Sequence, residues 1–154
     1  MNTKTKPGSV IAVLVLLILI ATYQLVYGLF GLLGAVLIEG SDLRNRLPAE
    51  FAAEAEAAQN LVWAVYLGAG LALVYGLVSI VLAVMVGKDH PRARGATIVV
   101  NAIAGVALLA LMFTAVYGLG AIISALFAFT VVALLYNGSS RRHYAVAIGA
   151  HAST

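Results

Sequence analysis

Three long stretches of this chain contain no Asp, Glu, Lys, Arg or His, and they restrict what it can fold into. They are Val10–Ile38 with 29 residues, Ala57–Gly87 with 31 and Gly95–Ser140 with 46. A helix of about 20 apolar residues crosses the roughly 30 Å of hydrocarbon in a bilayer. With 63% hydrophobic and 10% charged residues, the chain also lacks the polar side chains that cover a water-soluble domain. We therefore predict an integral membrane protein.

The third stretch is too long for one crossing and divides at Tyr117–Gly120, where two glycines permit a tight turn. The predicted fold is an all-α, antiparallel four-helix membrane bundle. Its four spans cover about 10–38, 57–87, 96–116 and 121–136, within a membrane domain over 10–137. The remaining parts are an N-terminal tail at 1–9, an outer loop at 39–56, a cytoplasmic loop at 88–95 and a C-terminal tail at 138–154.

The distribution of basic residues gives the orientation. Four spans place seven Lys and Arg on the side of the two termini: Lys4, Lys6, Lys88, Arg92, Arg94, Arg141 and Arg142. The other side holds two, Arg44 and Arg46. Because basic residues favour the cytoplasmic side, we expect both termini in the cytoplasm of a bacterium, with the chain in its inner membrane. We also expect contacts worth about 1 kcal/mol each with anionic lipid headgroups from Lys88, Arg92, Arg94, Arg141 and Arg142.

The outer loop is acidic and precedes the second span. We expect the second helix to begin near Pro48 and to continue beyond the membrane before Trp63 and Tyr66 mark the interface. Glu50 and Glu54 lie four residues apart on one face of this helix. We interpret them as a solvated acidic face, with binding of a cation or a basic partner as the alternative.

Several kinds of chemistry are excluded by what the chain lacks. It has no cysteine, so thiolate chemistry and Cys-based metal sites are absent. The expected spans contain no carboxylate or histidine, which argues against ion-coupled transport through an intramembrane acid and against haem ligation. His90, His143 and His151 all lie in the expected cytoplasmic loop or tail. His143 and His151 are eight residues apart and lack carboxylate companions, so we expect solvated histidines instead of a metal site. No metal, cofactor, nucleic-acid partner or enzymatic activity is expected.

Two amides lie within the expected spans. At about 1.5 Å per residue, Gln24 is roughly 21 Å from Val10 and Asn101 about 9 Å from Gly95. These depths differ, so the two amides are not expected to share one site. We favour hydrogen bonds between helices, with a role in lining a binding site as the alternative.

Small residues recur every four positions and predict close contacts between helices. These helix–helix contacts are expected either inside the bundle or with another membrane subunit. The residues are Gly68, Ala72, Gly76, Ala110, Thr114, Gly118, Gly120, Ser124 and Ala128. A looser spacing of three relates Gly28, Gly31 and Gly34, which is a weaker signal of contact or of a bend.

The tetrapeptide Val-Tyr-Gly-Leu occurs three times, at Val26–Leu29, Val74–Leu77 and Val116–Leu119. The first two copies cross the membrane in opposite directions, so they cannot form a parallel repeat. We interpret the similarity as chance in a small alphabet of membrane residues, with a duplicated ligand site as the alternative.

No motif identifies a reaction, so we infer the function from the classes of chemistry that remain after these exclusions. We expect a non-enzymatic membrane protein that acts by helix association. It would be an accessory or assembly subunit of an inner-membrane complex, or a homo-oligomer, with lipids and another membrane protein or itself as partners. The alternative is a channel or carrier for a neutral or lipidic solute, formed by an oligomer and lined by Gln24, the tyrosines and Asn101.

Overall fold

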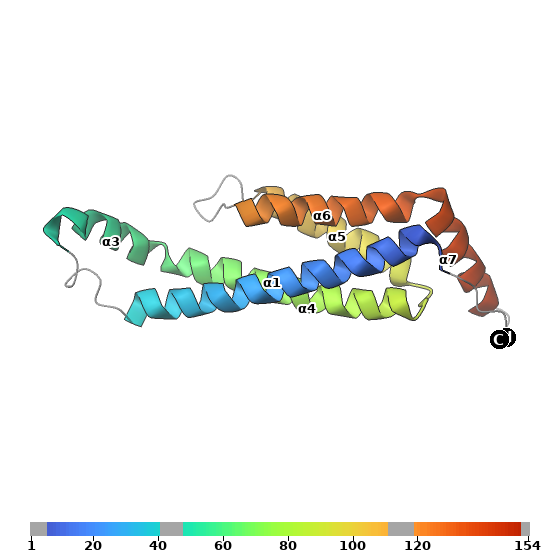
Figure 1. Cartoon of the computed structure of the whole chain (residues 1–154), viewed down its shortest axis with the longest axis horizontal. Coiled ribbons are helices and arrows are strands. Elements are labelled where there is room, and N and C mark those ends of the chain that lie inside the picture. Colours follow the sequence, from blue (N-terminus) through green and yellow to red (C-terminus); the bar gives the residue numbers. More distant parts are fainter. Residues whose placement is uncertain (1–5, 41–47, 111–118, 152–154) are drawn as a thin grey trace.

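The computed structural model describes residues 6–40, 48–110 and 119–151, and within these ranges all regular structure is helical (Figure 1). No strand occurs in these ranges, and the predicted all-α class is confirmed. The elements in chain order are α1 (Gly8–Gly40), η1 (Ala49–Phe51, a 3-10 helix), α3 (Ala52–Asn60), α4 (Val62–Gly87), α5 (Ala93–Ala110), α6 (Leu119–Tyr136) and α7 (Gly138–His151).

The helices include three that are long and apolar enough to cross a bilayer, namely α1, α4 and α5. A fourth candidate arises if α6 and α7 count together, although Gly120–Tyr136 and Gly138–Ala145 meet at a bend of 64°. The described part of the chain therefore contains three to four membrane-span candidates.

The four long helices lie in two closely packed pairs (Figure 1). α1 packs along α4 and α5 packs along α6, and α1 also contacts α6, whereas α4 and α5 touch only sparingly. We call the end that holds Pro7, the α4–α5 connection and α7 the terminus end, and the opposite end the α3 end. The two pairs are therefore held together mainly through α1 and α6.

Glycines allow α1 and α4 to approach each other closely. A Cβ atom placed on Gly28 would lie 2.9 Å from the backbone oxygen of Ala69, and one on Gly76 would lie 3.3 Å from that of Ala21. Small residues bring helices together in membranes, where hydrophobicity alone cannot drive association. The α1–α4 contact is of this kind.

A closely packed apolar core lies at the terminus end. It draws fully or almost fully buried side chains from all four long helices and from α7. Its members include Val10, Leu17, Val86, Ala93, Leu135 and Tyr144. The core thus ties α7 to the helices that precede it.

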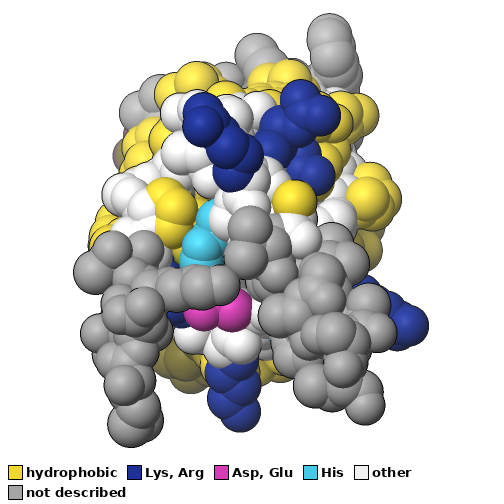
Figure 2. Space-filling view, turned by 90° about the vertical axis from the view of Figure 1, so that its right-hand side faces the viewer, with side chains coloured by type: hydrophobic (Ala, Val, Ile, Leu, Met, Phe, Trp, Pro, Cys, Tyr) yellow, Lys and Arg dark blue, Asp and Glu magenta, His cyan; other side chains and the backbone are white. Residues whose placement is uncertain are grey.

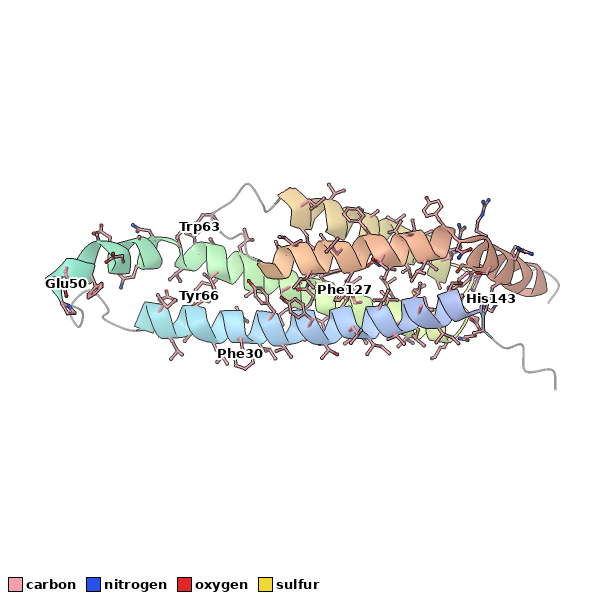
Figure 3. The ribbon with its side chains drawn as sticks, turned by 45° about the horizontal axis from the view of Figure 1, so that its top comes forward. Phe30, Glu50, Trp63, Tyr66, Phe127 and His143 are labelled. Atoms are coloured by element: carbon pink, nitrogen blue, oxygen red, sulfur yellow. The ribbon has the colours of Figure 1, made fainter. Side chains whose placement is uncertain are left out.

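The outside of the helices is strongly apolar. Phe30 is 71% exposed and Trp63 is 65% exposed, and Figure 3 shows Phe30 directed away from the neighbouring helices. A water-soluble protein rarely exposes contiguous apolar surface of this extent. Such a surface is suited to contact with lipid chains.

The segment before α4 differs from the expectation of one continuous helix from Pro48. Helical structure does begin there with η1 and α3, but it is interrupted at Leu61 before α4 starts at Val62. Asn60, the last residue of α3, has low helix propensity, which is consistent with a helix end at this point.

Two other boundaries concern the C-terminal part of the chain. The expected turn at Tyr117–Gly120 lies partly outside the described residues, and α6 is already helical at Leu119. The C-terminal tail expected at 138–154 contains the helix α7. The break before α7 falls at Asn137–Gly138, two residue types that are unfavourable inside helices.

Candidate functional site

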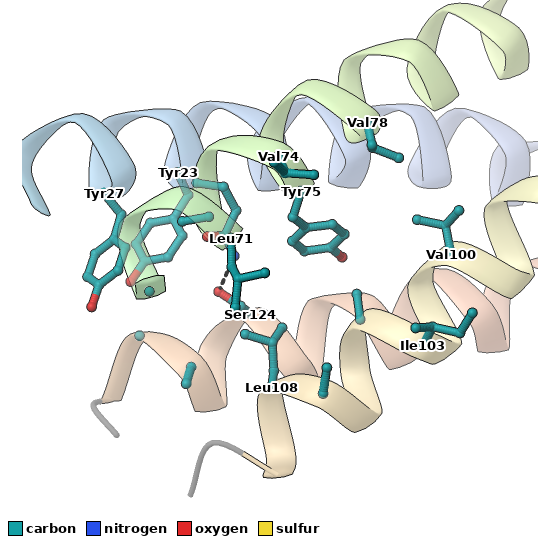
Figure 4. A pocket seen from close by; sticks show the side chains of 17 residues that line it. Tyr23, Tyr27, Leu71, Val74, Tyr75, Val78, Val100, Ile103, Leu108 and Ser124 are labelled. Atoms are coloured by element: carbon teal, nitrogen blue, oxygen red, sulfur yellow. Dashed lines mark hydrogen bonds between the residues drawn. The ribbon is translucent and has the colours of Figure 1, made fainter. Parts of the chain in front are cut away.

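A cavity of about 400 Å³ lies between the two helix pairs, toward the α3 end of the molecule (Figure 4). Side chains of α1, α4, α5 and α6 line it, and most of its wall is apolar. None of the described residues that line it is an Asp, Glu, Lys, Arg or His. The volume falls within the roughly 300–1,000 Å³ that is typical of ligand pockets.

The cavity opens sideways between α4 and α5. The most exposed of its lining side chains are Leu71 (51%), Val74 (60%) and Ile103 (65%), and Tyr27 on α1 is 48% exposed. The three aliphatic residues lie on α4 and α5, two helices that touch only sparingly. An aliphatic rim at the middle of two span candidates faces the region where lipid chains lie.

A hydrogen bond between two polar side chains crosses one wall of the cavity. The Gln24 Nε2 atom on α1 donates to Ser124 Oγ on α6 at 2.9 Å (dashed in Figure 4). Gln24 is only 4% exposed. Its carbonyl oxygen accepts no hydrogen bond from the part of the chain that the structure describes. A buried amide with an unused acceptor is costly in an apolar setting unless a partner reaches it.

Two stacked tyrosines form the end of the cavity nearest α3. The rings of Tyr23 and Tyr27 lie 6.1 Å apart between centroids and 17° from parallel. The Tyr23 hydroxyl lies against Gly120, where an added Cβ would collide with it. Neither hydroxyl has a hydrogen-bond partner among the described residues. Gly120 therefore makes room for a hydroxyl that is free to bind something else.

A second polar pair joins α4 to α5 farther toward the terminus end. The Tyr75 hydroxyl donates to Asn101 Oδ1 at 2.9 Å, and Asn101 Nδ2 donates to the backbone oxygen of Thr97 at 2.9 Å. Tyr75 lines the cavity, whereas Asn101 lies behind it and is fully buried. Gln24 and Asn101 thus belong to separate hydrogen-bonded pairs, each joining two helices.

The small-residue stripes lie mostly inside the chain. Gly68 and Ala72 line the cavity, as do Gly120 and Ser124, while Gly76 is buried against α1. Ala128 is fully buried. Ala110 is exposed, and Thr114 and Gly118 lie outside the described residues. Small side chains at four lining positions help explain why a hollow remains between the helices.

The first two copies of the tetrapeptide repeat occupy matching environments. Tyr27 and Tyr75 both line the cavity. Gly28 meets Leu73 and Ala69 on α4, and Gly76 meets Leu25 and Ala21 on α1. The two sets of contacts are equivalent: adding 48 to the number of each α1 residue, and subtracting 48 from that of each α4 residue, turns one set into the other. The antiparallel pair α1–α4 therefore has local two-fold character, and the third copy lies largely outside the described residues.

A polar cluster closes the terminus end of the molecule. Lys6 Nζ lies 3.2 Å from Asp89 Oδ1, and His143 Nε2 lies 3.1 Å from the same oxygen. Lys6 also donates to the backbone oxygens of Val86 and Gly87, the last residues of α4. We call Lys6, Asp89 and His143 the Asp89 cluster. It connects the start of α1, the α4–α5 turn and α7.

The environment of Asp89 favours its charged form. Burial alone would raise the pKa of this carboxyl, but hydrogen bonds from His143 and Lys6 and their charges outweigh burial and lower the pKa below its ordinary value. Asp89 has a left-handed backbone with φ of 52°, a conformation that Asp adopts more readily than most residues. The expectation of a solvated His143 without a carboxylate partner is wrong, because the fold brings together two residues 54 positions apart.

The basic residues assigned to lipid headgroups all lie at the terminus end. Figure 2 looks onto this end and shows Lys and Arg side chains around an acidic and a histidine side chain. Lys88, Arg92, Arg141 and Arg142 are exposed. Arg94 already has contacts within the chain. Its Nε donates to the Leu135 backbone oxygen at 3.2 Å, and its guanidinium lies 5.9 Å from the centroid of the Tyr136 ring.

Within the described ranges, no three His, Asp or Glu side chains gather as metal ligands. Comparisons of the chain with known protein families, curated proteins and solved structures found no match.

Proposed function

We propose that the chain is an antiparallel four-helix bundle in a bacterial inner membrane, with both termini in the cytoplasm. The support is the excess of basic residues on the side of the termini. The test uses single cysteines, which the natural chain lacks. Cysteines at Glu50 and Glu54 should react with an impermeant reagent in intact cells, and one at Arg92 only after permeabilisation. Equal labelling at all three positions would contradict the four-span arrangement.

We further propose that the chain binds a small apolar or lipidic molecule between its helices, as a non-enzymatic binding or carrier protein. The observation that carries this proposal is the cavity, which is uncharged, of ligand size and open sideways between α4 and α5. Unfilled apolar volume inside a protein costs roughly 24 cal/mol per Å³. An apolar group that enters the hollow gains contacts with its apolar lining, which favours occupation by a hydrocarbon chain.

This proposal develops the alternative of a carrier for a neutral or lipidic solute, but it places the site within one chain instead of between protomers. That alternative required a lining of Gln24, tyrosines and Asn101. The cavity is lined by Gln24, Tyr23 and Tyr75, whereas Asn101 lies outside the lining and accepts a hydrogen bond from the Tyr75 hydroxyl.

Action mainly through association with another membrane protein, or with a second copy, has less support. Of the stripe residues in the described part of the chain, only Ala110 is exposed. The others are engaged within the chain or line its cavity. Association as an accessory or assembly subunit therefore stays a second proposal.

A photoreactive hydrocarbon probe in vesicles tests binding to the cavity. We expect its crosslinks to concentrate on the cavity-lining residues of α4, α5 and α6. Ala104 lines the cavity, and an Ala104→Phe change should fill part of it and reduce these crosslinks. Val106 is 62% exposed and lies outside the cavity, so Val106→Phe is the matched control. Crosslinks spread evenly over the lipid-facing surface, unaffected by Ala104→Phe, would overturn the proposal.

A further inference from the structure

The two ends of the cavity differ in chemistry, and this difference narrows the class of ligand, given the proposed function. Toward the terminus end the wall is mainly aliphatic, with Val78, Val100 and Ile103 (Figure 4), and the Tyr75 hydroxyl on this side already donates to Asn101. Toward the α3 end it carries Tyr23, Tyr27 and Gln24. A molecule that satisfies both ends has a hydrocarbon part and a polar head.

The polar end can hydrogen-bond but cannot neutralise a charge. The hydroxyls of Tyr23 and Tyr27 have no partners among the described residues, and the Gln24 carbonyl oxygen is likewise unused. Together they provide both donors and acceptors. No charged side chain lines the cavity in the described part of the chain, and an unpaired charge in an apolar environment is strongly unfavourable. An uncharged head group that both donates and accepts hydrogen bonds therefore fits this end of the cavity.

The size of the cavity restricts the hydrocarbon part. A volume of about 400 Å³ lies toward the lower end of the roughly 300–1,000 Å³ that is typical of sites for small molecules. That is enough for one chain of moderate length together with a small head. A two-chain phospholipid would leave most of its bulk outside.

The position of the opening gives the route of entry. Leu71, Val74 and Ile103 form an aliphatic rim at the level of the lipid chains. A ligand already dissolved in the bilayer reaches the cavity there without passing through water. We infer that the cavity holds an uncharged single-chain lipid with a hydroxyl head, which lies against Tyr23, Tyr27 and Gln24 while its chain extends toward Val78 and Val100.

Four photoreactive probes with the same chain test this inference: an alcohol, an alkane, an alkyl phosphate and an alkyl trimethylammonium. In vesicles containing the full chain, the alcohol should label the cavity about three- to tenfold more than the alkane, the ratio expected for one net hydrogen bond. Both charged probes should label it less than the alkane. The crosslinked residues are identified by mass spectrometry of peptides.

Two variants connect the selectivity to the polar end. Tyr27→Phe removes an unpartnered hydroxyl from a side chain that is 48% exposed, so it should fold normally and lower the alcohol-to-alkane ratio. Gln24→Leu should lower the ratio further, and its folding is checked by circular dichroism. Tyr136→Phe, at a residue 61% exposed and outside the cavity, should leave the ratio unchanged.

The outcomes separate this inference from the proposed function. If the alkane labels the cavity as strongly as the alcohol, or the alkyl phosphate labels it best, the hydroxyl-headed lipid is wrong while binding of an apolar molecule stands. If no probe concentrates on the lining residues, the proposed function itself fails. An alcohol preference that survives both Tyr27→Phe and Gln24→Leu would also overturn the assignment of the head position.

Discussion

At the terminus end, Leu17 and Leu135 are fully buried among side chains of all four long helices and α7, and the Asp89 cluster connects three separate segments. At the α3 end, the same four helices leave a cavity between them, and the hydroxyls of Tyr23 and Tyr27 have no partners within the described residues. The terminus end is closed by packing, although Thr97 Oγ1 and the Tyr144 hydroxyl are buried there without a hydrogen-bond partner. At the α3 end the unpartnered hydroxyls border open volume instead. The proposed binding cavity and the most closely packed core therefore lie at opposite ends of the molecule.

The strongest test of this contrast compares two leucines. Leu17→Ala at the terminus end should cost about 2–5 kcal/mol in the free energy of unfolding, because it opens a hole in a closely packed core. Leu108 already borders the cavity and is only partly buried, so Leu108→Ala should cost much less. Reversible unfolding in mixed detergent, followed by circular dichroism, measures both. Equal losses would show that the two ends are packed alike.

The α1–α4 contact, which both ends share, allows a sharper comparison between two glycines. An added Cβ at Gly28 would lie 2.7 Å from Leu73 Cγ and 2.9 Å from a backbone oxygen, whereas at Gly76 the nearest atom is Leu25 Cγ at 3.0 Å. Gly28→Ala should therefore destabilise the chain by about 1–3 kcal/mol through overpacking, and Gly76→Ala clearly less. Gly34 has no atom within 4 Å of its added Cβ, so Gly34→Ala is the control and should be neutral or stabilising.

A smaller effect is expected at the Asp89 cluster. Asp89→Asn keeps a residue that tolerates the left-handed backbone but removes the charge, and should cost about 0.5–1 kcal/mol because the partly exposed carboxylate is screened by solvent. The pKa of Asp89 is lower in the folded chain than its ordinary value of 3.8. Its contribution to stability is therefore present above that value and is lost as the pH falls toward the folded pKa. Unfolding measured between pH 5 and about pH 2 should show this loss in the natural chain and a weaker dependence in Asp89→Asn.

The smallest effect on stability is expected at Gly120, yet it changes the polar end of the cavity. A Cβ there collides with the Tyr23 hydroxyl, and the flexible end of that side chain can move aside, so Gly120→Ala should alter stability by less than about 1 kcal/mol. The alcohol-to-alkane labelling ratio should nevertheless fall, because the hydroxyl is displaced. Unchanged labelling would show that the position of Tyr23 does not matter to binding.

The sequence was sufficient to predict the helical class and the presence of several apolar helices long enough to span a membrane, because long runs without charge leave few other solutions. It also revealed the tetrapeptide repeat, but it did not predict that the first two copies occupy matching environments. The shared environments of Tyr27 and Tyr75 depend on how two antiparallel helices are rotated about their axes. The spacing of residues along one helix does not determine how that helix is rotated toward its neighbour.

Pairings between distant residues were also beyond sequence reasoning. Gln24 was expected to bond another helix, yet nothing in its neighbourhood identifies Ser124 as the partner 100 positions away. Asp89 was not identified as a site residue from the sequence. The available signal was that Lys6, the 88–95 loop and the C-terminal tail were all expected on one side of the membrane. The contact between Asp89 and His143 depends on the bend before α7, which turns His143 toward the α4–α5 connection.

The length of α1 has a consequence for the bilayer. Its uncharged stretch of 29 residues, Val10–Ile38, spans about 44 Å as a helix at roughly 1.5 Å per residue, well beyond the roughly 30 Å thickness of an average hydrocarbon layer. Such an excess is accommodated by tilting or by local thickening of the bilayer, and α4 must follow because it packs along α1. A thinner bilayer would therefore tilt the α1–α4 pair more than a thicker one. Because α4 and α5 touch only sparingly, such a tilt would change the width of the opening between them.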